Sequence, residues 1–222
     1  MLLLVVLILG TFIVSSSILV VHAGTIHVPG DYPTIQKAIN AANVNDTVLV
    51  SAGTYSELVS LNRTVHLVGV DKTSTVLDGG GAGTVVNVTA NGATIAGFTI
   101  QNAVVDAPTV ELFRVKNVNI TGNIIISNPK ASRPTGAGVD LFKSNNTLID
   151  RNVFSQNLYA VNITGSTLNR ISNNQMITGD PLGVEITEGS RNVIIGNSFA
   201  SDEEGVDLNG ASSNFNNITR NL

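Results

Sequence analysis

Residues 138–222 repeat one short pattern four times. The four laps read GVDLFKSNNTLIDRNVFSQN (138–157), AVNITGSTLNRISNNQMITGD (160–180), GVEITEGSRNVIIGNSFASD (183–202) and GVDLNGASSNFNNITRNL (205–222). Their second residues lie 22, 23 and 22 positions apart, at Val139, Val161, Val184 and Val206. A constant period of this length is typical of a stacked repeat, in which each unit buries its apolar face against its neighbours.

Apolar and polar residues alternate at the start of each lap. Val139 and Leu141 would therefore lie on the same face of a short strand. A second column of inward residues follows in each lap, at Ile149, Ile171, Ile194 and Ile218, and a third follows in the first three laps, at Phe154, Met176 and Phe199. Helical repeats would need longer runs with apolar spacings of three and four, and those runs are missing. We therefore predict an all-β fold, a parallel β-helix or solenoid.

An asparagine stands between the last two columns in every lap, at Asn152, Asn174, Asn197 and Asn221. Equivalent residues on parallel strands stack ~4.8 Å apart, so these amides can form a ladder of side-chain hydrogen bonds. The register extends back to laps that contain Val110 and Val86, and in the earlier of these Phe98 takes the asparagine position. The step from Val110 to Val139 is 29 residues, which predicts a projecting loop at 128–136.

The first 21 residues are almost wholly apolar. Val21-His22-Ala23 has the small or short residues that a signal peptidase requires, which predicts a signal peptide over residues 1–23 and cleavage before Gly24. The segment contains no Lys or Arg and is long enough to span a bilayer, so an uncleaved membrane anchor is the alternative. Both alternatives predict an extracellular, periplasmic or cell-surface location, with only this segment in the membrane.

Residues 24–222 are predicted to form one domain, with an N-terminal cap at 24–46. Pro33 suits the first turn of a helix, and the apolar stripe after it contains Ile35, Ala38, Ile39 and Ala42. A repeat stack has an apolar end that must be covered, and this helix would cover it. At the other end the chain stops within a lap, so we expect an incomplete C-terminus.

Composition excludes several classes of function. There is no cysteine, which removes thiol catalysis, thiolate metal sites and redox chemistry. The net charge of −4 argues against nucleic acid as a partner. After signal cleavage two histidines remain, His27 and His66, and they form no cluster with ligand spacing.

The run IHVPGDYPTIQKAINAANVNDTVLVSAGTYSELVSLNRTVHLVGVDKTSTVLDG (26–79) resembles the opening of proteins of the pectin-lyase-like superfamily. The later laps resemble the parallel β-helix repeats of NosD-like and related surface proteins. This resemblance spans residues 25–222 and implies a right-handed, single-stranded parallel β-helix. It implies no single activity, because the superfamily holds lyases, hydrolases, esterases, epimerases and proteins with no known catalysis. Copper binding, which a NosD-like protein implies, is not expected from the residues present.

One outward column is rich in acids: Asn87, Glu111, Asp140, Asn162, Glu185 and Asp207. Carboxylates at rung spacing repel one another unless a cation lies between them. The candidate substrate-binding residues are Glu111, Asp140, Glu185 and Asp207, and the candidate calcium ligands are Glu185 and Asp207. The candidate catalytic residues are Asp140 and Glu185 as an acid–base pair, with Arg151 as a lyase base by analogy with the superfamily. The alternative is an ordinary hydrated surface, since Asn162 interrupts the acidic row.

Three functions stay open from the sequence. The preferred one is a secreted or cell-surface module that binds carbohydrate without catalysis. The second is a polysaccharide lyase or glycoside hydrolase that acts on acidic polysaccharide, with the 128–136 loop as a roof. The third is an accessory protein of a membrane complex. No cofactor is predicted unless the acidic column binds calcium, and the aromatic candidates for sugar stacking are Tyr55, Tyr159 and Phe215.

Overall fold

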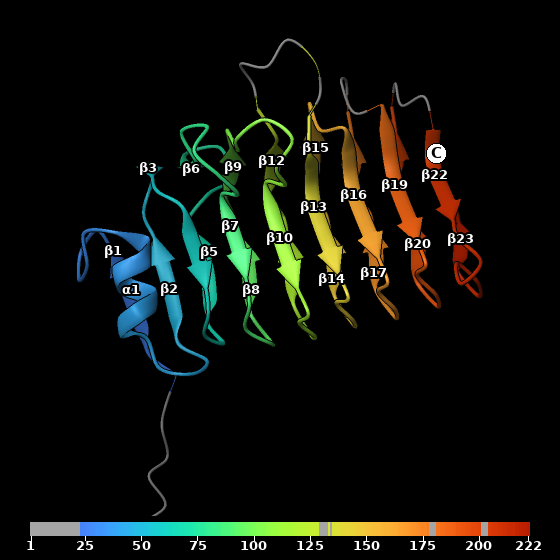
Figure 1. Ribbon diagram of the computed structural model, residues 1–222. Helices are drawn as coiled ribbons and strands as arrows, with labels where there is room; N and C mark the ends of the chain where they lie inside the picture. The colour runs from blue at the N-terminus through green and yellow to red at the C-terminus, as the bar shows by residue number, and fades with distance from the viewer. Residues whose placement is uncertain (1–22, 129–132, 134, 178–180, 201–203) are drawn as a thin grey trace, which may run out of the picture.

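Each lap of the chain contributes strands to parallel sheets, and successive laps stack side by side along the molecule (Figure 1). The computed structural model describes residues 23–128, 133, 135–177, 181–200 and 204–222. The predicted signal peptide lies outside the described residues except for Ala23. Strands in three parallel sheets and one short helix near the N-terminus confirm the predicted all-β parallel β-helix.

The three sheets run the length of the stack. Sheet A has nine strands: β1 (Thr25–Val28), β2 (Thr47–Val50), β5 (His66–Gly69), β8 (Thr94–Ala96), β11 (Asn119–Thr121), β14 (Leu148–Asp150), β17 (Arg170–Ser172), β20 (Val193–Ile195) and β23 (Asn217–Thr219). Sheet B has seven: β3 (Gly53–Ser56), β6 (Thr75–Asp78), β9 (Thr99–Gln101), β12 (Ile124–Ile126), β15 (Val153–Ser155), β18 (Gln175–Met176) and β21 (Ser198–Phe199). Sheet C has seven: β4 (Val59–Leu61), β7 (Val86–Val88), β10 (Val110–Phe113), β13 (Ala137–Phe142), β16 (Tyr159–Thr164), β19 (Leu182–Thr187) and β22 (Glu204–Asn209).

The core consists of the inward columns that the alternation predicts. In sheet C, Val139, Val161, Val184 and Val206 pair in register, and the first three are buried. In sheet A the column of isoleucines is buried as far as Ile194, and Ile218 in the last lap is 41% exposed. In sheet B the column holds Phe154, Met176 and Phe199. Packing against the laps on both sides keeps these strands together, because a single lap has too little apolar surface to fold alone.

The laps begin with small residues, which lie at the start of the strands of sheet C. A Cβ atom on Gly183 would lie 2.4 Å from the carbonyl oxygen of Gly205 and from the ring of Phe199. Glycine at this position therefore lets neighbouring laps approach closely.

The predicted asparagine ladder is present, and all of its members except Asn221 are buried. It runs through Asn123, Asn152, Asn174, Asn197 and Asn221. Asn152 Nδ2 donates to Asn174 Oδ1 at 3.1 Å, and the same oxygen accepts the backbone N–H of Asn152 at 2.9 Å. In the earlier lap the backbone N–H of Phe98 donates to Asn123 Oδ1 at 3.0 Å, so Phe98 occupies the position expected for it. The ladder satisfies turn amides that would otherwise be buried without partners.

A second ladder, which sequence reasoning missed, lies at the other turn. Asn169 Nδ2 donates to Asn192 Oδ1 at 3.0 Å, and Asn192 Nδ2 donates to Asn216 Oδ1 at 3.2 Å. The signal was available in the sequence, because each of these residues lies two positions before an inward isoleucine of sheet A.

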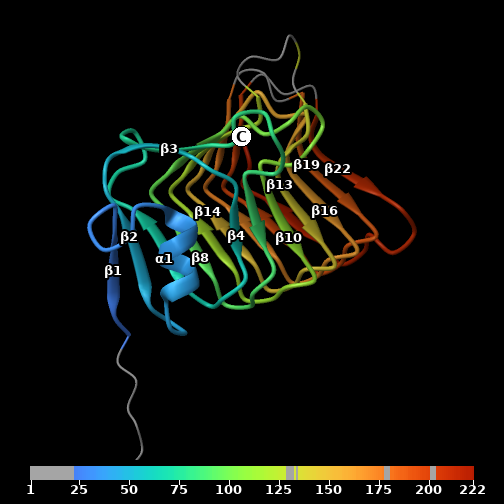
Figure 2. The ribbon, with the colours of Figure 1, turned by 60° about the vertical axis from the view of Figure 1, so that its left-hand side comes forward.

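The helix α1 (Ile35–Ala41) lies across the N-terminal end of the stack (Figure 2). It contacts β1, β2 and β4. All four members of the predicted stripe, Ile35, Ala38, Ile39 and Ala42, are buried. The location of the helix is therefore compatible with the predicted cap, while residues 25–28 of the predicted cap segment form the first strand of sheet A.

The start of this helix differs from the prediction. Thr34, rather than Pro33, is next to the first helical residue: its backbone is extended, and its side chain accepts the backbone N–H of Lys37 at 3.3 Å. Threonine is preferred at this capping position because its oxygen satisfies an unpaired amide of the first turn. The Glu57 carboxylate accepts the next free amides, those of Ile35 and Gln36, at 2.9 and 3.0 Å.

Candidate functional site

The acidic column lies in register on the outer face of sheet C. Neighbouring strands align Asn87 with Glu111, Glu111 with Asp140, Asp140 with Asn162, Asn162 with Glu185, and Glu185 with Asp207. The structure therefore brings all four predicted substrate-binding acids onto one face. Asn162 divides them into an early pair, Glu111 and Asp140, and a late pair, Glu185 and Asp207.

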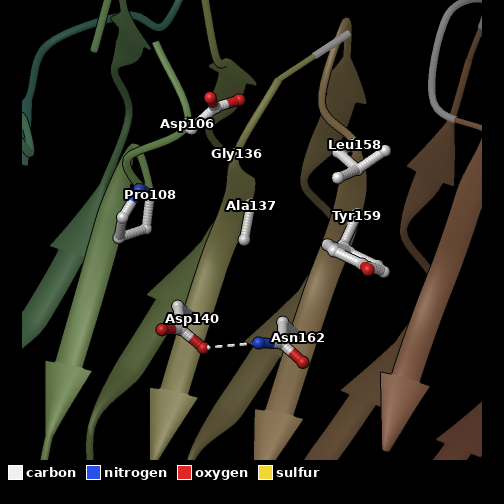
Figure 3. Close-up of a pocket in the computed structure, with 8 residues that line it drawn as sticks. All are labelled: Asp106, Pro108, Gly136, Ala137, Asp140, Leu158, Tyr159 and Asn162. Atoms are coloured by element: carbon white, nitrogen blue, oxygen red, sulfur yellow. Dashed lines mark hydrogen bonds between the residues drawn. The ribbon is translucent and has the colours of Figure 1, made fainter. Parts of the chain in front are cut away.

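Asp140 lies in a hollow of about 300 Å³ on this face (Figure 3). The lining residues are Asp106, Pro108, Gly136, Ala137, Asp140, Leu158, Tyr159 and Asn162. Burial first, and the Glu111 charge second, raise the pKa of Asp140 from 3.8 to about 6. A hydrogen bond from Asn162 Nδ2 to Asp140 Oδ1, 3.0 Å long, opposes this rise. Asp140 can thus exchange a proton near neutral pH, which is the property required of a general acid.

Two stacked aromatic rings border the acidic column. The centroids of Phe113 and Phe142 lie 5.5 Å apart, and their planes differ by 8°. The two residues pair across β10 and β13, each two positions beyond an acid of the column. The Arg114 guanidinium lies 5.1 Å from the Phe113 centroid and the Lys143 amine 5.3 Å from that of Phe142. Sequence reasoning missed this pair, although VELF and VDLF carried the signal.

Tyr159 links the hollow to the late acidic pair. Partial burial, the Glu185 charge and a hydrogen bond to Glu185 raise the pKa of the Tyr159 hydroxyl. Of the other aromatic candidates, Tyr55 packs against the core and Phe215 is 80% exposed in the last lap. Tyr159 is therefore the one predicted aromatic that joins this face.

The late acidic pair is bridged by an amide. Asn209 Nδ2 donates to Glu185 Oε1 at 3.2 Å and to Asp207 Oδ2 at 2.7 Å. The amide hydrogens occupy the place between the carboxylates that a calcium ion would take. Within the described ranges, no group of three or more His, Cys, Asp or Glu residues could hold a metal ion.

Arg151 lies away from the acidic column. It follows β14 of sheet A, and its Nε donates to Asp150 Oδ2 at 2.6 Å. Burial raises the pKa of Asp150, but hydrogen bonds from Ser172, Asn173 and Arg151 outweigh it and leave that pKa below its usual value. The structure thus places Arg151 beside a buried structural carboxylate and does not bring it to Asp140 or Glu185.

The predicted 128–136 loop adjoins the hollow. Residues 129–132 and 134 lie outside the described residues, but Arg133 Nη2 lies 3.7 Å from Asp106 Oδ1, and both side chains are exposed. Because Asp106 and Gly136 line the hollow, a cation from the loop lies at its border.

Comparison with protein families shows which family the chain belongs to. The family model for the periplasmic copper-binding protein NosD matches residues 39–222. The chain belongs to the NosD family. A search of curated proteins gave no match.

Solved structures similar to this NosD-family chain are parallel β-helices. The catalytic domain of a GH87 α-1,3-glucanase in complex with nigerose superposes with a TM-score of 0.62 at 17% identity, covering 88% of this chain and 38% of that one. The pectin methylesterase PemA from Erwinia chrysanthemi gives a TM-score of 0.55 at 13% identity, covering 86% and 67%. A pectin methylesterase in complex with a hexasaccharide gives 0.53 at 13% identity, with the same coverage. At these identities the likeness shows the fold alone.

The described residues of this NosD-family chain do not fit a copper site. His27 and His66 lie in β1 and β5, strands separated by β2, and His66 Nδ1 contacts Thr94 Oγ1 at 3.0 Å. Met176 is fully buried in the core. Copper prefers imidazole and sulfur ligands, and the described residues bring no such set together. Across the described ranges, moreover, no helix is both long and apolar enough to cross a membrane.

Proposed function

We propose that this NosD-family protein is exported to the periplasm or cell surface and binds a carbohydrate chain without cleaving it. The outer face of sheet C is the binding surface. The observation that carries the proposal is the stacked pair Phe113 and Phe142 beside the hollow of Asp140. The family's periplasmic description supports the location.

The chemistry of this face suits a sugar. The face of an aromatic ring is electron-rich, so it attracts the partly positive C–H groups of a pyranose. Phe113 is 42% exposed, so part of its surface is open to a ligand. Asp140, Asn162 and Tyr159 supply hydroxyl-binding groups within the adjacent hollow. A few polar groups next to apolar surface are typical of ligand sites.

Charge favours a neutral sugar over an acidic one. Four carboxylates lie in the acidic column of this face, and the late pair lacks a cationic side chain between its carboxylates. An acidic polysaccharide laid along the column would be repelled, because like charges at rung spacing interact unfavourably. A neutral polysaccharide meets no such penalty.

Affinity electrophoresis tests the proposal. The protein would run through native gels that contain neutral glucans or galactomannans, or the acidic polymers polygalacturonate and alginate. We expect retardation by a neutral polymer, and an apparent affinity about five-fold lower for Phe142→Ala, since an aromatic contact contributes roughly 1 kcal/mol. Thr164→Ala is the matched control, because Thr164 pairs with Phe142 one rung further on. Unchanged migration in every gel, or equal retardation of Phe142→Ala and the parent protein, would contradict the proposal.

A polysaccharide-cleaving enzyme is the second candidate. It rests on Asp140, a partly buried carboxyl with a pKa of about 6 beside the Glu111 carboxylate. Such a pair resembles the acid and base that glycosidases place on either side of the scissile bond. Acidic substrates would additionally need calcium or protons to offset the charge of the column.

One incubation experiment distinguishes the two candidate functions. The polysaccharides would be sized by gel filtration after exposure to the parent protein and to Asp140→Asn. Shortened chains with the parent and intact chains with Asp140→Asn would establish the enzyme. Intact chains in both, together with retardation in the gels, would leave the binding function.

A further inference from the structure

A buried carboxylate holds the beginning of the first strand. Asp46 is 3% exposed, and its Oδ1 accepts the backbone N–H of Gly24 at 2.6 Å. Its Oδ2 accepts the backbone N–H of Asn43 at 2.7 Å. The Gly24 carbonyl in turn accepts the backbone N–H of Thr47 at 2.8 Å, so Gly24 is already in register with sheet A.

Asp46 has no cationic partner among the described residues. The ion pairs found there are Arg133 with Asp106 and Arg151 with Asp150. Hydrogen bonds from the backbone amides of Gly24 and Asn43 outweigh the effect of burial and hold the pKa of Asp46 below its usual value, so the carboxylate is ionised and can pair with a cation. A positive charge at the Gly24 nitrogen, which already lies at ion-pair distance, would complete the site.

Gly24 is also the residue that would follow a signal peptide. Ala23 and Gly24 are both exposed, and Ala23 lines a hollow together with Asn43, Val44 and Asn45. The bond between them is therefore accessible, and the residues before it have the pattern that a signal peptidase cleaves.

We propose that cleavage of the Ala23–Gly24 peptide bond creates a Gly24 ammonium that forms an ion pair with the Asp46 carboxylate. A signal peptidase adds one water across the amide: Ala23 leaves as a carboxylate, and the nitrogen of Gly24 becomes an ammonium with three donors. The charged donor strengthens the contact that the amide makes in the uncleaved chain, because charge-assisted hydrogen bonds are roughly twice as strong as neutral ones. Export and cleavage thus stabilise the first strand of sheet A.

The first test determines where the exported chain is cleaved. The full chain would be expressed with export into the periplasm of a bacterial host, and the intact mass and N-terminal residue of the product would be measured. We expect the product to begin at Gly24. A product that begins at any other residue would overturn the proposal.

The second test measures the effect of the ion pair on thermal stability. Two forms would be prepared by removing an N-terminal tag, one beginning at Gly24 and one retaining Val21-His22-Ala23. We expect the Gly24 form to melt about 4 °C higher, and Asp46→Asn to remove that difference. The matched control is Asp71→Asn, because Asp71 also accepts a backbone amide, that of Thr73, but belongs to a different turn; it should leave the difference intact. Equal melting of the two parent forms, or a difference that survives Asp46→Asn, would refute the ion pair.

A third measurement covers the case in which Asp46→Asn does not fold. NMR of the Gly24 form labelled in glycine would follow the titration of its α-amino group. Pairing with Asp46 should move its pKa above the ordinary range of about 7.7–8.0. A value inside that range would show that no ion pair forms.

Discussion

Asn162 Nδ2 donates a hydrogen bond to Asp140 Oδ1, 3.0 Å long, across adjacent rungs of sheet C. This contact gives the Asp140 carboxylate a neutral neighbour on one side, while Glu111 is its charged neighbour on the other. Asp140 is therefore the member of the acidic column whose protonation should respond most clearly to its surroundings.

Asp140 should make folding stability decrease with rising pH. Its folded-state pKa of about 6 lies above its ordinary value of 3.8, so the folded protein binds the proton more tightly. The resulting stabilisation is complete below pH ~4 and is lost as the pH rises through about 6. We expect the Asp140→Asn variant to lack this loss, which we place at about 1–2 kcal/mol after solvent screening. Urea unfolding of both proteins from pH 4 to 7 measures the difference.

Glu111→Gln is the control for this effect. Removing the Glu111 charge should lower the pKa of Asp140 and reduce the loss of stability without abolishing it, because burial remains the first cause. Identical pH profiles for the parent protein and Asp140→Asn would show that the raised pKa is wrong.

The buried amide ladder should be essential for stability. Asn174→Ala removes hydrogen bonds to Asn197 and to the Ile149 carbonyl, and leaves the backbone N–H of Asn152 without its acceptor. Each unsatisfied buried group costs roughly 1–3 kcal/mol, so we expect a loss of about 3 kcal/mol and a fall in Tm of about 6–12 °C. Thermal unfolding followed by circular dichroism measures it. Asn119→Ala, at an exposed position of sheet A, should change stability by less than about 0.5 kcal/mol.

Asp150 should contribute to the stability of the fold, and Arg151 should contribute less. Asp150→Ala leaves Ser172 and Asn173 without the carboxylate that they contact at 2.7 and 2.9 Å, so we expect a loss of about 2 kcal/mol. Arg151→Ala removes a side chain that is 77% exposed and should cost less than about 1 kcal/mol. Chemical denaturation measures both. If Arg151→Ala instead abolished cleavage of a polysaccharide by a catalytically active protein, Arg151 would belong to the catalytic site after all.

Calcium binding should depend on Asn209. In the parent protein a calcium ion between Glu185 and Asp207 must displace the Asn209 amide. Asn209→Asp replaces two donors by an acceptor and adds a negative charge, both of which favour calcium. We expect millimolar calcium to raise the Tm of Asn209→Asp by several degrees more than that of the parent. Magnesium in place of calcium is the control ion, and equal shifts in both proteins would contradict the expectation.

The architecture could be predicted from the sequence, because a β-helix is built from local patterns repeated at a constant period. Alternation at Val139 and Leu141 specified which side chains point inward, and the 22–23-residue step specified which residues stack. The asparagine ladder and the acidic column follow from the same stacking rule, so both could be predicted. The second ladder at Asn169 and the ring pair at Phe113 follow the same rule, and they were missed because their columns extend over fewer laps.

The grouping of columns on one face, and the contacts outside the repeat, depend on how the whole chain folds. The turn after β14 places Arg151 on sheet A beside Asp150, away from the Asp140 hollow, and the direction of such a corner is not encoded in residue spacing. The amide of Asn209 reaches two carboxylates at once, which depends on side-chain rotation. Asp46 contacts Gly24 in an irregular first lap, where no repeat specifies which residues are neighbours. This contact therefore could not be predicted from the sequence.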